Sequence, residues 1–126
     1  MFQIVYEYAE PWPQQGIVQI QPPATAMQIA VSPDSARRKV NGYLTMHVSM
    51  SLLAGKPILM MNQQPIWRVP LELRLQDLGH VAMLGTIEVD AQTRELTPLT
   101  AQQIRTIQDQ ANELIIRLTP EATAPV

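Results

Sequence analysis

The chain has 126 residues, of which 46% are hydrophobic and 16% are charged, a balance that suits a single globular domain with its own core. Nine basic against eleven acidic residues give a net charge of -2, so the chain lacks the overall positive field that holds nucleic-acid phosphates or an anionic membrane. The absence of cysteine excludes disulfides, thiolate nucleophiles and zinc sites that need thiolates.

The sequence also narrows the expected setting and partners. No apolar run reaches the length of about 18 residues that a membrane-spanning helix needs, and the first residues contain no basic leader. We therefore expect a cytoplasmic protein that binds neither a membrane nor nucleic acid.

Residues 1–31 are predicted to form an extended arm, because four prolines interrupt any helix. Residues 16–21 are compatible with a short strand at a sheet edge, where flanking prolines are tolerated. The arm carries aromatic rings that it has too little local structure to bury alone. We expect these rings to contact a second copy of the chain. The aromatic residues concerned are Phe2, Tyr6, Tyr8 and Trp12.

A first helix is predicted to begin at Ser32, with Pro33 at its first position, and to end at Gly55 before Pro57. Serine is a good N-cap, proline is favoured at the first helical position, and glycine commonly follows a helix end. Apolar residues recur at three- and four-residue steps, which predicts a core-facing stripe. The stripe consists of Ala36, Val40, Tyr43, Leu44, His47, Val48 and Ser51.

Three strands are predicted after this helix. Residues 58–61 form a short apolar run, and residues 66–75 and 81–90 alternate apolar with polar side chains, which is the period of a half-buried strand. A slip of one residue would expose the apolar side of one long strand, so the hairpin register is defined. Gly85 predicts either a bulge or a helix close to the sheet. The expected partners are Trp67–Val89, Arg68–Glu88, Val69–Ile87, Leu71–Gly85, Leu73–Met83 and Leu75–Val81.

A second helix is predicted to begin at Thr100, with Gln103 completing a capping box. These elements predict an α+β fold in which an antiparallel sheet of three or more strands packs with two helices, in the order extended arm, helix, three strands, helix. Residues 1–31 are the arm, residues 32–118 a single domain, and residues 119–126 a tail that we expect to be disordered. The apolar stripe of the second helix consists of Ile104, Ile107, Ala111, Leu114, Ile115 and Leu118.

The last predicted strand runs into a distinctive turn, because residues 89–96 read VDAQTREL. From Pro33 to Leu96, the order of helix and strands with this turn resembles the PepSY-type module, whose last strand ends in a VDA-x-TG turn. Arg94 stands where that pattern has glycine. The resemblance implies a binding or inhibitory module without catalytic residues of its own. The hairpin from WRVP at residues 67–70 to the VDA-x-T turn is also similar to that of small bacterial proteins of unassigned function.

Each polar side chain that could act in catalysis or bind a metal also has a purely structural interpretation. His47 lies on the predicted apolar side of the first helix, where a packed histidine is the commoner use. His80 and Asp77, in the hairpin loop, are too few ligands for a metal site. Glu88 is expected to form a cross-strand ion pair and Asp90 to serve the turn that follows it. We therefore predict no catalytic residue, no metal site and no cofactor.

The only concentrated charge is the run Arg37, Arg38 and Lys39 in the first turns of the first helix. Cations there oppose the helix macrodipole instead of complementing it. The functional interpretation is a docking patch for an acidic partner or for phosphates. The alternative is a solvated polar face with Asp34 nearby.

Methionines cluster around the first helix and the first strand, where flexible thioethers can adapt to a second surface. Together with the aromatic arm they predict a homodimer, in which the arm or the strand at residues 58–61 adds to the neighbour's sheet. The methionines are Met46, Met50, Met60, Met61 and Met83.

We therefore predict a non-catalytic protein-binding or regulatory module that acts as a homodimer. One alternative is a neutralising partner of a toxin or peptidase, for which a flexible arm that folds on its target would be suitable. Another is a small-ligand binder or enzyme that uses the space between sheet and helices, lined by Tyr43, His47 and Trp67.

Overall fold

The computed structural model describes residues 5–8, 12, 18–20, 27–61, 63–75 and 78–118. Phe2, Asp77 and residues 119–126 therefore lie outside the described part. The predicted α+β class, an antiparallel sheet packed with two helices, is confirmed. The elements are β1 (Val5–Tyr6), β2 (Val18–Ile20), β3 (Met27–Ile29), α1 (Pro33–His47), β4 (Leu52–Ala54), β5 (Ile58–Met61), β6 (Pro65–Leu75), β7 (Gly79–Asp90) and α2 (Ala101–Leu118).

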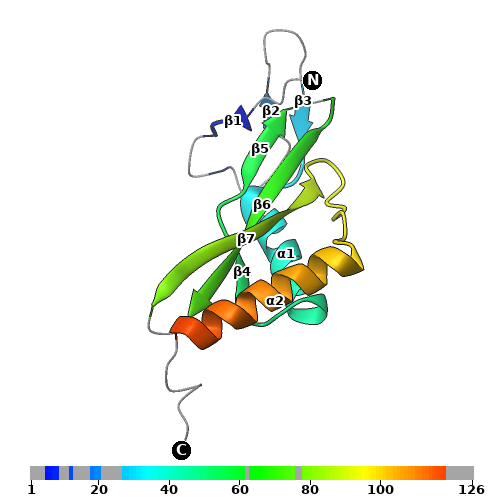
Figure 1. Ribbon diagram of the computed structural model, residues 1–126. Helices are drawn as coiled ribbons and strands as arrows, with labels where there is room; N and C mark the ends of the chain where they lie inside the picture. Colours follow the sequence, from blue (N-terminus) through cyan, green and yellow to red (C-terminus); the bar gives the residue numbers. More distant parts are fainter. Residues whose placement is uncertain are drawn as a thin grey trace, which may run out of the picture.

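The strand β6 lies at the centre of the main sheet (Figure 1). On one side its residues 65–68 pair with β5 and its residues 71–73 pair with β4, and on the other side it pairs with β7. β1 adds two residues to the outer side of β5. All these pairs are antiparallel, and β2 and β3 form a separate two-stranded sheet.

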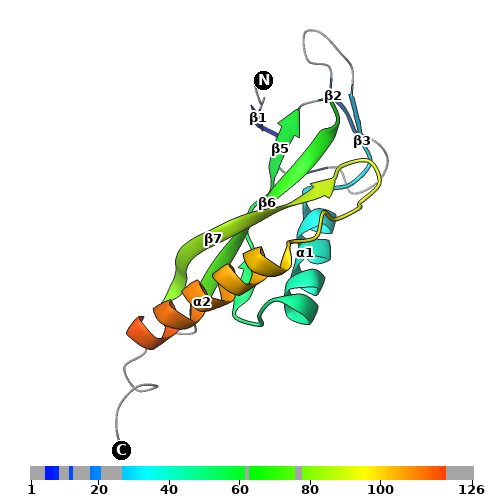
Figure 2. The same cartoon turned by 45° about the vertical axis from the view of Figure 1, so that its right-hand side comes forward.

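The hydrophobic core lies on one face of this sheet, because alternate side chains of β6 point to it and both helices pack there. α2 lies along β7 in both ribbon views (Figures 1 and 2). The opposite face of the sheet, which we call the back face, carries no helix in the described part of the chain. The core residues of β6 and of the two helices include Trp67, Val69, Leu71, Leu73, Ala36, Val40, Leu44, Ile107 and Ala111.

The predicted hairpin register is confirmed over half of its length and wrong over the rest. From Trp67 to Leu71 the partners in β7 are those expected. Two bulges then shift the register, and each adds one residue to β7. The observed partners are Glu72–Met83, Leu73–Ala82, Arg74–His80 and Leu75–Gly79, in place of the predicted Leu73–Met83 and Leu75–Val81.

Two glycines explain where the register changes. Gly79 has a φ of 68°, a left-handed conformation that favours glycine, and it closes the hairpin opposite Leu75, so the turn is shorter than predicted. Beside Gly85, Ile107 Cδ1 of α2 lies 3.4 Å from the position that a Cβ would take. Both alternatives predicted for Gly85 therefore occur, because a bulge adjoins it and a helix packs onto it.

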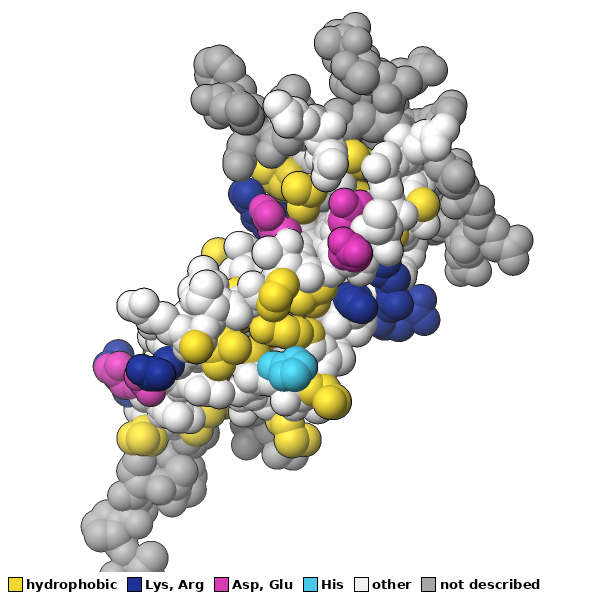
Figure 3. Space-filling model, turned by 90° about the vertical axis from the view of Figure 1, so that its right-hand side faces the viewer, with side chains coloured by type: hydrophobic (Ala, Val, Ile, Leu, Met, Phe, Trp, Pro, Cys, Tyr) yellow, Lys and Arg dark blue, Asp and Glu magenta, His cyan; other side chains and the backbone are white. Residues whose placement is uncertain are grey.

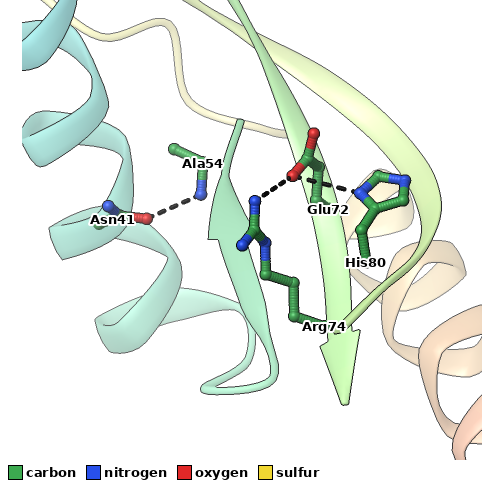
Figure 4. Close-up of polar contacts among 5 residues, drawn as sticks. All are labelled: Asn41, Ala54, Glu72, Arg74 and His80. Atoms are coloured by element: carbon green, nitrogen blue, oxygen red, sulfur yellow. Dashed lines mark hydrogen bonds and ion pairs between the residues drawn. The ribbon is translucent and has the colours of Figure 1, made fainter. Parts of the chain in front are cut away.

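α1 ends at His47, so the prediction that this helix continues to Gly55 is wrong in its last turns. The chain forms β4 instead, with Leu52 and Ala54 buried against β6. Asn41 of α1 secures this strand, because its Oδ1 accepts a hydrogen bond from the Ala54 amide at 2.8 Å (Figure 4). A strand of three residues is too short for its alternation to stand out in the sequence.

Gly55 permits a close approach of two segments instead of ending a helix. Its amide donates a hydrogen bond to the Pro70 carbonyl at 2.8 Å. A Cβ on this residue would stand 2.9 Å from Pro70 Cγ and would contact the carboxylate of Glu72. The chain after β4 therefore lies against β6 only because the side chain is absent.

We predict that Gly55→Ala lowers the free energy of unfolding by about 1–3 kcal/mol, the usual cost of forcing atoms into a packed site. Urea denaturation of the two proteins measures this difference. The matched control is Gly42→Ala, since nothing lies within 4 Å of a Cβ at that helical position. Alanine there should raise stability by about 0.5–1 kcal/mol. Equal effects of the two substitutions would contradict the close approach at Gly55.

Candidate functional site

The basic residues predicted as a partner-binding patch, Arg37, Arg38 and Lys39, are all exposed on α1. Arg38 Nε lies 3.3 Å from Asp34 Oδ2, one helical turn earlier, and both side chains are largely exposed. An exposed pair of this kind contributes less than about 1 kcal/mol. The acidic neighbour expected for a solvated face is therefore present for Arg38.

Two of these cations, Arg38 and Lys39, line an open groove of about 710 Å³. The groove lies between α1 and the segment that leaves β7, and we call it the cationic groove. Figure 3 shows hydrophobic side chains gathered beside Lys and Arg side chains on this side of the molecule. Its lining residues are Arg38, Lys39, Gly42, Tyr43, Met46, His47, Arg94, Glu95 and Leu96.

Arg94 also lines the cationic groove, but the sequence pattern did not predict it as part of the basic patch. The Asp90 carboxylate holds the turn before it by accepting hydrogen bonds from the amides of Gln92 and Thr93 at 2.7 and 3.0 Å. The turn gives Arg94 a φ of 70°, which costs an ordinary residue on the order of 1–2 kcal/mol. The PepSY-type pattern has glycine at this position, and an arginine in place of that glycine is the sequence signal that marks Arg94 as unusual.

The side chain of Arg94 reaches back to the beginning of α1. Its Nη2 donates a hydrogen bond to the Ser35 carbonyl at 3.4 Å. This contact joins residues far apart in the sequence and brings a third guanidinium or ammonium group to the groove.

The floor of the cationic groove is aromatic and apolar. The rings of Tyr43 and His47 lie in contact, with centroids 4.9 Å apart and planes tilted by 42°. The Tyr43 hydroxyl accepts a hydrogen bond from the Leu99 amide at 3.1 Å. Leu96 bridges to Val89 of β7. His47 is exposed, so its predicted place on the core-facing side of the helix is wrong, because α1 turns into its C-cap at this point.

Two of the predicted dimer contacts, Tyr8 and Trp12, pack within the chain against Trp67. The three rings meet edge to face, with centroids 5.2 to 5.6 Å apart. The Trp67 indole donates a hydrogen bond to the Val31 carbonyl at 2.7 Å, and the Tyr8 hydroxyl donates one to the Pro57 carbonyl at 2.8 Å.

The other two predicted dimer contacts are described less fully. Phe2 lies outside the described residues, and for Tyr6 only the backbone is described, paired with Leu59 of β5. The interior site predicted from Tyr43, His47 and Trp67 is not formed as one cavity. Trp67 is fully buried, whereas the other two residues line the cationic groove.

The back face of the sheet holds a second open groove, of about 690 Å³. Its walls come from β1, β5, β6 and β7 and from the segment before β5, and they include Pro70 and Lys56. Large hydrophobic side chains of this face are exposed. They are Val5 at 56%, Leu53 at 44%, Ile58 at 39% and Met83 at 60%.

Glu72 and His80 line the same groove, and Figure 4 shows the polar cluster that they form with Arg74. Glu72 Oε1 lies 3.0 Å from Arg74 Nη2 and 3.2 Å from His80 Nδ1. Burial raises the pKa of the Glu72 carboxyl. The hydrogen bonds and charges of Arg74 and His80 lower this pKa by a larger amount, so it lies below its ordinary value of 4.5. His80 therefore contacts a carboxylate that the sequence did not pair with it.

The remaining candidate side chains have the structural roles predicted for them. Glu88 forms the cross-strand pair with Arg68, with 3.2 Å between Oε2 and Nη2, and Asp90 caps its turn. Within the described ranges no three His, Asp or Glu side chains group as metal ligands. None of the helices described is long and apolar enough to cross a membrane.

Comparisons of the chain with known protein families, with curated proteins and with solved structures find no match. The resemblance to PepSY-type modules and to small bacterial proteins therefore stays a prediction.

We predict that Glu72→Gln lowers stability at pH 7 and that the difference from the unmodified protein disappears in acid. A carboxyl whose pKa is lowered by folding stabilises the folded state above pH 4.5, and this contribution is lost as the pH falls through the lowered pKa. Urea denaturation at a series of pH values from neutral down to strongly acid measures the difference.

The control for this prediction is Glu113→Gln, which removes an exposed ion pair with Arg117 in α2. Its effect should stay within about 0.5 kcal/mol at every pH. A difference for Glu72→Gln that does not change with pH would contradict the ionised contact with Arg74 and His80.

Proposed function

We propose that this chain is a non-catalytic protein-binding module that works as a homodimer. The observation that carries this proposal is the back face of the sheet, where Val5, Ile58 and Met83 are exposed around one groove. Contiguous apolar surface of this kind marks interaction sites in folded proteins. An interface there would bury side chains that one chain leaves in water.

The charges of the back face favour a second copy as the occupant. Lys56 and Arg74 supply positive charge beside the groove, and Glu7 and Glu72 supply negative charge. A two-fold interface brings the same patch of both subunits together, so charged groups on it can pair across the interface only where both signs are present. A patch with one sign only would repel its own copy.

This proposal changes the contact expected from the sequence, in which the arm or the strand at residues 58–61 adds to the neighbour's sheet. β5 already pairs with β6 and with β1 of its own chain. The backbone groups of β5 at these positions are therefore engaged within one subunit. A contact through the face of the sheet uses side chains and leaves that pairing intact.

The non-catalytic part of the proposal rests on the roles of the acid–base candidates. The carboxylates of Glu72 and Glu88 are each held by a guanidinium group, and Asp90 accepts two amide hydrogen bonds in its turn. Each of these groups is occupied by a contact that stabilises the sheet or its connection. A carboxylate that acts in acid–base catalysis must instead reach a substrate proton.

We predict that Met83→Glu weakens the homodimer by at least about tenfold, because the substitution puts a charge into an apolar contact. Sedimentation velocity over a range of protein concentrations up to about 100 µM measures the dissociation constant, since dimer formation depends on concentration. The control is Met50→Glu, in the turn between α1 and β4, where the side chain is 84% exposed. An unmodified chain that stays monomeric throughout, or equal dimerisation of both variants, would contradict the proposal.

A further inference from the structure

We infer that the cationic groove binds an acidic segment of a second protein, in which Asp or Glu residues are interspersed with large apolar residues. This inference rests on the proposed role as a protein-binding module. It uses a different surface from the back face that carries the homodimer.

The charge of the groove is opposite to that of the chain. Three cations line it, Arg38, Lys39 and Arg94, against one carboxylate, Glu95, whereas the whole chain has a net charge of -2. Within the described residues Lys39 and Arg94 form no ion pair, and only Arg38 has a carboxylate partner. A partner with negative charge would therefore supply what these two side chains lack.

The helix does not need cations at this position. Arg38 and Lys39 lie in the second turn of α1, where the macrodipole, whose effect falls off within the first turn, does not favour a cation. The two side chains raise the positive potential at this end of the groove, which favours a bound carboxylate. The pair with Asp34 stabilises α1 locally at Arg38. In the described part of the chain Lys39 has no such pair, so binding an acidic segment gives this cation a role that local helix stability does not.

Arg94 adds to the same potential despite an unfavourable backbone conformation. It has a φ of 70°, and its guanidinium group is directed toward α1 by the contact with the Ser35 carbonyl. Strained residues that persist in a fold point to a functional requirement at that place. Here the strained residue is the one that completes the cationic lining.

The aliphatic part of the floor favours an acidic protein segment over a simple polyanion. Tyr43, Met46 and Leu96 line the groove, and the Met46 side chain is 77% exposed. Phosphates of nucleic acid would be attracted by the cations but would leave this floor uncovered. A segment with Leu, Ile or Phe between its acidic residues covers the floor and meets the cations at once.

The test selects random twelve-residue peptides displayed on phage against the purified full-length chain at low salt, and then measures the binding of synthetic winners by calorimetry. We expect enriched peptides to combine Asp or Glu with large apolar residues. Binding should weaken at least about threefold when the salt is raised severalfold, because the contacts are charged and exposed. Single-stranded DNA of mixed sequence is titrated in parallel.

Charge-reversal variants locate the binding site. Lys39→Glu with Arg94→Glu should weaken the winning peptides by about tenfold or more. The matched control is Arg105→Glu with Arg117→Glu, which changes the net charge equally on the exposed side of α2 and should leave the affinity within about twofold. Circular dichroism checks that both variants are folded.

A second pair of variants tests the apolar floor. Met46→Ser should weaken binding by about threefold or more, because it removes apolar surface that the partner covers. Met50→Ser removes a methionine of similar exposure, 84% against 77% for Met46, outside the groove lining and should have no effect.

Each other outcome overturns the inference. The groove does not take an acidic segment if no peptide is selected or if the selected peptides lack acidic residues. The same conclusion follows if the selected peptides bind the Lys39 and Arg94 double variant with unchanged affinity. Tight binding of DNA through the same two residues would assign the groove to a polyanion. Sedimentation of the same variants keeps the two proposals apart, because a groove that fails this test leaves the dimer through the back face unaffected.

Discussion

The fold depends on one strand that is buried completely on one side. Trp67, Val69, Leu71 and Leu73 of β6 are all inaccessible to water, and each such side chain contributes about 1.5–3 kcal/mol when it is buried. The same strand supplies the backbone partners of β4, β5 and β7. Because its pairing and its packing are fixed together, the positions of the other strands and of both helices follow from β6.

This arrangement separates two surfaces with different chemistry. Both helices cover the Trp67 side of the sheet, so the back face keeps exposed hydrophobic residues beside paired charges. The turn after β7 returns the chain to α1, and there Arg94 joins Arg38 and Lys39 above an apolar floor. We propose the two roles for different sides, because a module that dimerises through one face can still bind a partner through another.

Part of each candidate surface could be predicted from sequence. Arg38 and Lys39 stand out because charge in the first turns of a helix is visible in the sequence itself. Arg94 does not, because it lies in another element and reaches the groove only through the turn held by Asp90. Similarly, Glu72 and His80 meet only after two bulges move the register. A bulge depends on the hairpin turn and on the packing of Ile107 against Gly85, which are not local to the strand.

The sequence by itself determined the features that follow from helix capping and from the period of the side chains along each element. These are the start of α1 at its Ser32 cap, the alternation of β6 and of residues 85–89 in β7, the pairing of Arg68 with Glu88 and the α+β class. The tertiary structure decided where α1 stops, since β4 is stabilised by β6 and by Asn41 and not by its own three residues. It also decided which face stays open and which cations meet. Contacts between distant segments settle these features, because short strands and exposed side chains have too little local preference to settle them alone.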